Sequence, residues 1–330
     1  MDTPNASTIR PSLGASLARI VRDSLRISLE LFKIMVPVVI AVKVLQELGA
    51  IAWLARPLAP LMGLVGLPAE IGLVWATAML NNIYSGILVF ASLPLAEPLS
   101  VAQVTVLSTM ILVAHGLPVE LRIAQRSGTR LGFQLGLRFL GALAFGAILH
   151  TTYSSLDVLQ EPARMLWQPA AQADTSLTAW VIGQARNFAS IFLIILGLVA
   201  FVRLLERIRA TEAMNRVLGP LLRLLGIGPT ASTITIVGLT MGLSYGGGLI
   251  IHEAKSGSVS KRDVFYAVSL MGLCHSLFED TLLMMLLGAH TSGILWGRLL
   301  LSLAAVALLV RLTRRMADPA FERRLGRSVA

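Results

Sequence analysis

The sequence has few charged residues and only one cysteine. Of its 330 residues, 14% are charged and 55% are hydrophobic, and the mean hydropathy is +0.75. Soluble domains average roughly 25% charged residues, so this composition excludes an ordinary soluble globular protein. The single cysteine, Cys274, excludes an intrachain disulfide and any multi-cysteine zinc or iron–sulfur site.

Acidic residues are scarcer than basic ones, which gives a net charge of +10. The basic residues cluster between apolar segments and at both ends, as the positive-inside rule predicts for a membrane protein. No module that combines aromatic and basic residues is present, so nucleic acid is not a predicted partner. Membrane lipids are, and residues 1–23 are predicted to form an amphipathic arm on an anionic membrane face.

Long apolar runs are abundant, and a spanning helix needs about 20 mostly apolar residues. Two further apolar segments, 54–67 and 214–227, contain proline and glycine and are too short to cross comfortably. The predicted spans are 27–48, 69–93, 100–121, 131–153, 178–202, 229–252, 263–284 and 293–312.

The chain repeats itself after about 160 residues. "RPLAPLMGLVG" (Arg56–Gly66) matches "RVLGPLLRLLG" (Arg216–Gly226) at six of eleven positions. Polar landmarks keep a similar offset over 100 residues, which indicates a duplication. The aligned pairs are Tyr84 with Tyr245, Gly86 with Gly247, His115 with His275, Glu120 with Asp280, and Arg138 with Arg298.

Charge asymmetry suggests how the two copies are oriented. If every basic segment is cytoplasmic, each copy crosses the membrane an odd number of times, and the two copies form an inverted repeat. The predicted fold is an all-α polytopic membrane protein in which each half has about four full spans, one of them broken, plus one short or re-entrant segment. The predicted domains are 1–23 (arm), 24–153 (first repeat), 154–177 (extracytoplasmic link), 178–312 (second repeat) and 313–330 (basic cytoplasmic tail).

Two spans contain poor helix formers near their centres. The 26 uncharged residues Ile71–Ala96 contain "NNIYSG", and the related segment of the second copy contains "SYGGG". Broken backbone at membrane depth is tolerated only against protein or a wet cavity, and paired breaks in repeat transporters mark the binding site. Close helix packing through small residues is the alternative interpretation. The predicted substrate-binding residues are Asn81, Asn82, Tyr84, Ser85, Gly86, Ser244, Tyr245, Gly246 and Gly247.

A second matched set carries ionisable groups. His115, Glu120, His275, Glu279 and Asp280 lie within predicted spans, where such residues are costly and usually face the interior. They are predicted to carry a coupling or gating charge for a proton or cation. In the alternative interpretation, Glu120 and Asp280 form structural ion pairs with Arg138 and Arg298. A metal site is a weaker alternative, because no two histidines share a local motif, and none is predicted.

Taken together, "NNIYSGILVF" and "AHGLPVE", repeated as "MGLSYGGGLIIHEAKSG" and "CHSLFEDTLL", resemble the nucleoside-recognition or gate-domain membrane proteins. That group includes bacterial spore-maturation membrane proteins, and related gate segments occur in ferrous-iron and concentrative nucleoside transporters. The resemblance covers roughly residues 24–150 and 180–312. It implies an inner-membrane transport fold with re-entrant or broken helices meeting at the centre. The GTPase loop and the cysteine-and-proline gate of the iron transporters are absent.

These features predict a secondary transporter or facilitator of a small polar solute, nucleoside-like or an organic anion, in the bacterial cytoplasmic (inner) membrane with both termini cytoplasmic. No catalytic residue and no cofactor is predicted, and the sequence allows a homo-oligomer. The alternatives are a non-transporting assembly or regulatory subunit and, with less support, a membrane-embedded metalloenzyme.

Overall fold

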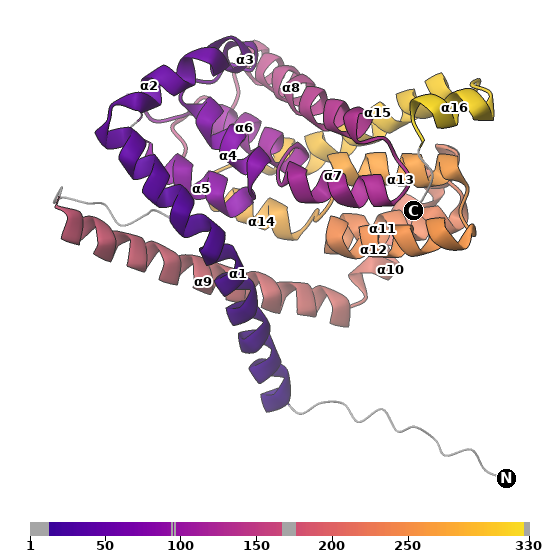
Figure 1. Ribbon diagram of the computed structural model, residues 1–330, viewed down its shortest axis with the longest axis horizontal. Coiled ribbons are helices and arrows are strands. Elements are labelled where there is room, and N and C mark those ends of the chain that lie inside the picture. Colours follow the sequence, from indigo (N-terminus) through magenta and orange to yellow (C-terminus); the bar gives the residue numbers. More distant parts are fainter. Residues whose placement is uncertain (1–12, 94, 96, 167–175, 327–330) are drawn as a thin grey trace.

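The computed structural model describes residues 13–93, 95, 97–166 and 176–326, and these residues fold almost entirely as helices (Figure 1). Within these ranges the β-type pairs are limited to two isolated bridges, Ser100–Pro162 and Thr129–Gly326. The prediction of an all-α membrane protein is confirmed at this level, because four helical segments are long and apolar enough to cross a membrane. They are Val101–Arg126, Leu131–Ser155, Leu177–Arg207 and Ser292–Thr313.

Among the described residues up to 166, the chain forms eight α-helices and one 3-10 turn. They are α1 (Leu13–Glu47), α2 (Ala50–Ala55), η1 (Arg56–Leu58), α3 (Ala59–Leu64), α4 (Ile71–Leu80), α5 (Ile83–Ser92), α6 (Val101–Val113), α7 (Leu117–Arg126) and α8 (Leu131–Ser155).

In the described range 176–326, the chain forms eight α-helices and one π-helical turn, η2. They are α9 (Leu177–Arg207), α10 (Ala210–Leu224), α11 (Pro229–Met241), α12 (Leu243–Ser256), α13 (Lys261–Leu273), α14 (Glu279–Met285), η2 (Ser292–Gly297), α15 (Arg298–Thr313) and α16 (Asp318–Arg324).

Two predicted spans, 69–93 and 229–252, are helical hairpins in the structure. A methyl group added at Gly86 would lie 2.9 Å from Ala78 Cβ, and one added at Gly246 would lie 2.5 Å from Gly238 Cα. In a continuous helix, residues eight apart are separated by about 12 Å, so the chain must fold back between them. The correction has a physical reason: each arm is too short to cross about 30 Å of hydrocarbon.

Each hairpin turns at a residue whose backbone conformation is not helical. Asn82 is extended (φ −162°, ψ 170°) and caps α5, since its side-chain oxygen accepts a hydrogen bond from Ser85 N at 2.9 Å. Gly242, 160 residues later, caps α12 with φ 93° and ψ 163°, a conformation that is essentially confined to glycine.

The short segments at 54–67 and 214–227 do not form full spans either. The first contains the end of α2 together with η1 and α3, none of them longer than six residues, and the second lies largely in α10, which has 15 residues. At about 1.5 Å per residue, α10 is about 22 Å long, which is less than the hydrocarbon thickness.

Matched N-caps begin the broken spans that follow each hairpin. Ser100 Oγ accepts a hydrogen bond from Gln103 N at 3.2 Å at the start of α6, and Ser260 Oγ accepts one from Asp263 N at 3.1 Å at the start of α13. The residues three positions after these caps, Gln103 and Asp263, also tether the loop before each hairpin through their side chains. Gln103 Nε2 donates to Gly66 O at 3.0 Å, and Asp263 Oδ1 accepts from Gly228 N at 2.9 Å.

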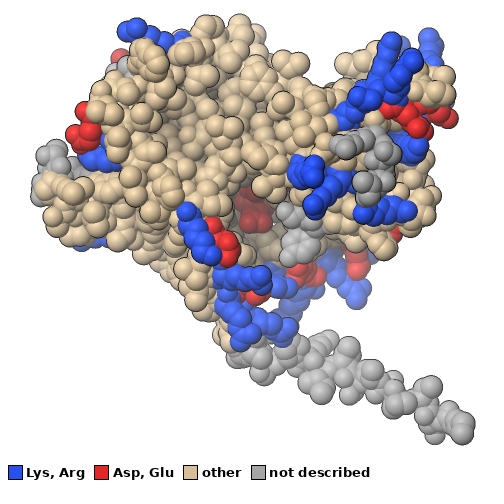
Figure 2. Space-filling view, viewed as in Figure 1, with Lys and Arg blue, Asp and Glu red and all other residues tan. Residues whose placement is uncertain are grey.

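Basic segments that are distant in sequence lie together. Figure 2 shows most of the visible lysine and arginine along the lower and right parts of the molecule, with a broad uncharged surface above them and a smaller group at the upper left. These segments are tied by ion pairs: Arg203 with Asp23 at 3.0 Å, Lys261 with Glu322 at 2.7 Å, and Arg262 with Asp318 at 2.8 Å. The link after α8 lies elsewhere, where Val101 N donates to Glu161 O and Leu166 N donates to Leu286 O, both at 2.9 Å.

The interior has one large apolar core and a small second one. The large core is formed mainly by α4–α8 and α11–α15, whereas the second joins α1 and α9 to α5. The buried residues of the second core are Met35, Val39, Leu88, Ile191 and Ile195.

Candidate functional site

Two helix breaks meet in the middle of the protein. The first separates α6 from α7 at residues 114–116, and the second separates α13 from α14 at residues 274–278. Gly116 (φ 53°) and Ser276 (φ 46°) adopt the left-handed conformation at positions 160 residues apart. Both breaks are anchored on the hairpins, because Gly116 N donates to Ala78 O at 2.9 Å and Leu277 N donates to Leu239 O at 2.7 Å.

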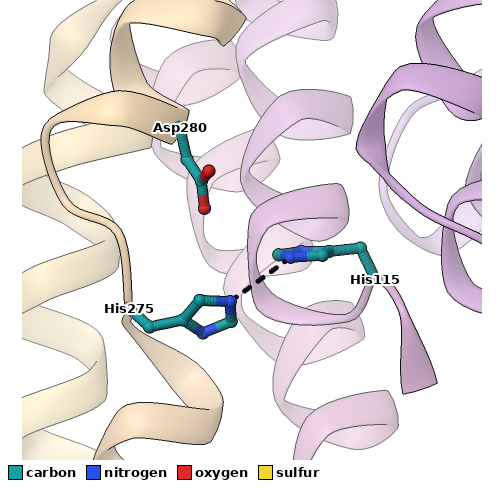
Figure 3. Close-up of side chains that lie close together, drawn as sticks. All are labelled: His115, His275 and Asp280. Atoms are coloured by element: carbon teal, nitrogen blue, oxygen red, sulfur yellow. Dashed lines mark hydrogen bonds between the residues drawn. The ribbon is translucent and has the colours of Figure 1, made fainter. Parts of the chain in front are cut away.

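Each break carries a buried histidine, and the two rings face each other (Figure 3). His115 Nδ1 is 2.9 Å from Ile111 O, and His275 Nδ1 is 2.8 Å from Met271 O. The two Nε2 atoms are 3.3 Å apart. The fold therefore joins side chains that are 160 residues apart in the sequence.

Acidic side chains converge on the same point. Glu120 Oε1 is 3.2 Å from His115 Nε2 and 3.3 Å from His275 Nε2. Asp280, at the start of α14, points toward the two rings (Figure 3), and one of its oxygens lies within 4.8 Å of a nitrogen of each. We call these four residues, His115, Glu120, His275 and Asp280, the central cluster.

The two buried arginines next to this cluster differ. Arg138 on α8 pairs with Glu120, and it also donates to Val113 O at 2.9 Å and to His115 O at 3.0 Å. Arg298 is fully buried beside the Cys274 thiol, yet none of its side-chain nitrogens has a carboxylate or carbonyl partner among the described residues, and Asp280 Oδ2 has no hydrogen-bond partner among them. Arg298 follows the π-helical turn η2, whereas Arg138 lies within the uninterrupted α8. Such π-helical turns occur frequently at functional sites.

The asparagines of the first hairpin bond to their neighbours. Asn81 Nδ2 donates to Ser85 Oγ at 2.7 Å, and Asn82 Nδ2 donates to Asn81 Oδ1 at 3.2 Å. With the Asn82 cap on Ser85 N, these bonds stabilise the turn between α4 and α5. The predicted ligand-binding groups of this stretch are thus occupied in holding the break in shape.

The glycines at the hairpins are packing contacts. Gly86 faces Ala78, Gly246 faces Gly238, and a methyl group at Gly247 would clash with Ile123 of α7. The hairpin caps are 160 residues apart, so Gly86 corresponds to Gly246 rather than to Gly247 as the sequence alignment predicts. Ser244 and Tyr245 lie in α12, but their side chains are outside the described residues.

Glu279 lines a cavity that reaches the edge of the central cluster. The Tyr84 hydroxyl lies within electrostatic reach of Glu279 and Asp280. A cavity of about 540 Å³ lies between α1 and α9, and Figure 2 shows a hollow with acidic atoms inside it, bordered below by basic residues. Its lining residues include Arg26 and Glu30 of α1, Arg203 of α9, Met241 and Glu279.

Comparison with known proteins places the chain in a family. It is 30% identical over 285 residues to the uncharacterized membrane protein YvoD of Bacillus subtilis (strain 168), an alignment that covers 84% of this chain and 87% of YvoD. The chain belongs to the YvoD family. No family model and no solved structure matches it. The YvoD relationship supports a membrane protein, and it names neither a solute nor the nucleoside-recognition family that the motifs resemble.

The meeting of the two histidines was missed by sequence reasoning, although both were named as candidates. The only available signal was their shared offset of 160 residues, which indicates equivalent positions but not contact. A second missed contact is Gln134 of α8 with Ser269 of α13, whose side chains hydrogen-bond at 3.1 Å and join the two halves.

Proposed function

We propose that this YvoD-family protein is a secondary transporter or facilitator of a small polar solute across the cytoplasmic membrane, working by alternating access between two inverted halves. The observation that carries the proposal is the 540 Å³ cavity that runs between α1 and α9 to Glu279, beside the buried central cluster. Buried ionisable groups at the end of a cavity are typical of solute and ion pathways in membrane proteins.

The arrangement of the hairpins supports the inversion. The loop before α4 is tied to the start of α6, next to the link after α8, through Gln103 and Gly66. The loop before α11 is tied to the start of α13, on the basic side, through Asp263 and Gly228. The two hairpins thus enter from opposite sides, as inverted repeats require. This arrangement gives each half three crossings. In the first half they are α1, α6–α7 and α8, and in the second half they are α9, α13–α14 and α15.

The difference between the two arginines supports alternating states. Arg138 is engaged with Glu120, whereas Arg298 and Asp280 are not bonded to each other. In an inverted repeat, the two halves exchange conformations between the inward-open and outward-open states. The cavity is bordered by Arg26 and Arg203 on the basic side, which in this proposal is the cytoplasmic side. The conformation would then be the inward-open one, in which Arg298 and Asp280 are not paired.

The solute class follows from the groups that reach the cavity. Glu279 can accept hydrogen bonds or a coupling proton, and Arg26 and Arg203 can donate hydrogen bonds and supply positive charge. This set suits a small polar solute with both donors and acceptors, such as a nucleoside or an organic anion. A proton or cation carried at Glu279 would supply the coupling.

Uptake into proteoliposomes tests the proposal. Purified protein should take up or exchange a radiolabelled solute from a panel of nucleosides and organic anions. Glu279→Gln should reduce the rate at least tenfold, whereas Glu97→Gln, an exposed glutamate outside the cavity, should leave it unchanged. Absence of uptake and exchange for every solute, with correctly oriented and folded protein, would overturn the proposal and favour the non-transporting subunit.

A further inference from the structure

The proton positions on the two facing histidines are fixed by their backbone partners. A carbonyl oxygen only accepts hydrogen bonds, so the Nδ1 atoms of His115 and His275 must both carry hydrogen to bond Ile111 O and Met271 O. In the neutral rings, both Nε2 atoms then carry lone pairs. Two lone pairs and the carboxylate oxygen of Glu120 therefore converge on one buried point.

Three acceptors in contact repel one another unless a cation lies between them. We propose that a divalent transition-metal ion of the zinc class binds here, with His115 Nε2, His275 Nε2 and Glu120 Oε1 as ligands and Asp280 as the fourth. The ligands come from both halves of the chain, so the ion joins them. The site does not depend on the protein being a transporter.

The spacing of these atoms fits a tetrahedral ion. Zinc binds histidine nitrogen at about 2.0–2.1 Å and carboxylate oxygen at about 2.0–2.2 Å, and in a tetrahedron the ligand atoms are then about 3.3–3.5 Å apart. The three measured separations are 3.3 Å between the nitrogens and 3.2 and 3.3 Å from Glu120 Oε1. Three corners of the tetrahedron are thus in place. Asp280 has one oxygen within 4.8 Å of a nitrogen of each histidine (Figure 3), and it would move closer to supply the fourth ligand.

The surroundings of the ligands also fit a metal site. Metal-binding histidines almost always donate their other ring N–H to a carbonyl or carboxylate, as both histidines do here. Arg138 pairs with the second oxygen of Glu120 and leaves Oε1 directed at the histidines. Two imidazoles with carboxylates and no thiolate suit zinc and its neighbours rather than magnesium or calcium, which prefer oxygen ligands throughout.

A proton shared by the histidines is the competing explanation. A single proton resides on one Nε2 atom. The other Nε2 and Glu120 Oε1 must then both accept from that one N–H group. The two nitrogens are 3.3 Å apart, a separation that allows one N–H···N hydrogen bond and that also equals a tetrahedral edge. A metal ion accepts all three lone pairs at once.

Metal binding by the full-length protein in detergent tests the proposal. The protein is purified with an affinity tag that contains no histidine, stripped with a chelator, and titrated with Zn²⁺ and with Co²⁺. We expect one ion per chain, a tetrahedral Co²⁺ visible spectrum, and X-ray absorption that reports two imidazole ligands at about 2.0–2.1 Å. His275→Gln and Glu120→Gln should each weaken binding more than about 100-fold, since loss of even an outer partner costs about 10- to 100-fold.

The matched control is His252→Gln, which removes an exposed histidine outside the central cluster and should leave affinity and stoichiometry unchanged. Asp280→Asn keeps the three close ligands and should reduce affinity less than His275→Gln does. The proposal is overturned if the wild-type protein binds no stoichiometric ion, or if it binds one with an absorption spectrum that lacks imidazole ligands. The wild-type spectra decide the matter even where a variant fails to fold. Metal binding without uptake would overturn only the transport function, and uptake without metal would overturn only this site.

Discussion

Substitution of Gly246 by alanine should distinguish close helix packing from ligand binding at the second hairpin. The added methyl carbon would lie 2.5 Å from Gly238 Cα, 2.9 Å from Gly238 N and 2.8 Å from Met271 Sδ. Non-bonded carbons prefer about 3.5–4.0 Å, so α11 and α12 would have to separate by about 1 Å. Because the closest atoms belong to the backbone, no change of rotamer relieves the clash.

The magnitude follows from these contacts. Overpacking of a core costs typically about 1–3 kcal/mol, and we expect the upper end here because the obstruction is backbone. Gly248→Ala is the matched control, since an added methyl group there meets nothing within 4 Å. It should gain about 0.5–1 kcal/mol, because glycine is less favourable than alanine within a helix. The two variants should therefore differ by about 3.5–4 kcal/mol in the free energy of unfolding.

Tryptophan fluorescence during thermal and denaturant unfolding in one detergent compares the variants directly. Gly246→Ala should unfold at a clearly lower temperature than the wild type, and Gly248→Ala at an equal or slightly higher one. Adding Met271→Ala to Gly246→Ala should restore only a minor part, because the contact with Gly238 remains. The reasoning is refuted if Gly246→Ala is as stable as Gly248→Ala. Loss of solute binding at unchanged stability would favour the ligand-binding interpretation of this glycine.

Four further outcomes are expected. Asn82→Ala should destabilise the protein by about 1 kcal/mol through loss of the cap on Ser85 N, whereas Asn82→Asp should retain most of the stability; equal unfolding midpoints for the two would contradict the capping role. Arg138→Met should cost about 3–5 kcal/mol, because it leaves the Glu120 charge buried and unpaired, and adding Glu120→Gln should recover part of that loss in the same unfolding assay; an additive double variant would argue against the pair. Arg203→Gln should change stability by less than about 1 kcal/mol, since its pairs with Asp23 and Glu206 are exposed; a larger loss in the unfolding assay would indicate a buried role. In a Cys274→Ser background, Glu97→Cys and Thr230→Cys should react with a membrane-impermeant thiol reagent from opposite sides of oriented vesicles, and reaction from one side would exclude the inversion.

Part of the fold followed from the sequence because apolar length is a strong signal. The charge-free run from Ile71 to Ala96 is long enough to span a membrane, so composition could not distinguish a straight helix from a hairpin. The distinction depends on a tertiary contact, Gly86 against Ala78, and on local capping by Asn82. The asparagine followed three residues later by serine was the available signal for a new helix start within the run.

The central cluster was predicted as a set of residues but not as a geometry. His115, Glu120, His275 and Asp280 were identified because ionisable groups are rare in apolar spans. Their convergence requires two breaks to meet, which depends on the hydrogen bonds of Gly116 to Ala78 and of Leu277 to Leu239. Contacts of this kind join segments that are far apart in the chain, and no local pattern records them. The missing carboxylate partner of Arg298 was equally invisible, because the equivalent Arg138 is paired.

The second apolar core has a mechanical consequence. Helices α1 and α9 pack on each other and on Leu88 of α5 through the five buried residues of the second core, and α9 also reaches the large core through Leu198. The same two helices line the cavity that reaches Glu279. A movement of either helix would therefore open or close access to that cavity.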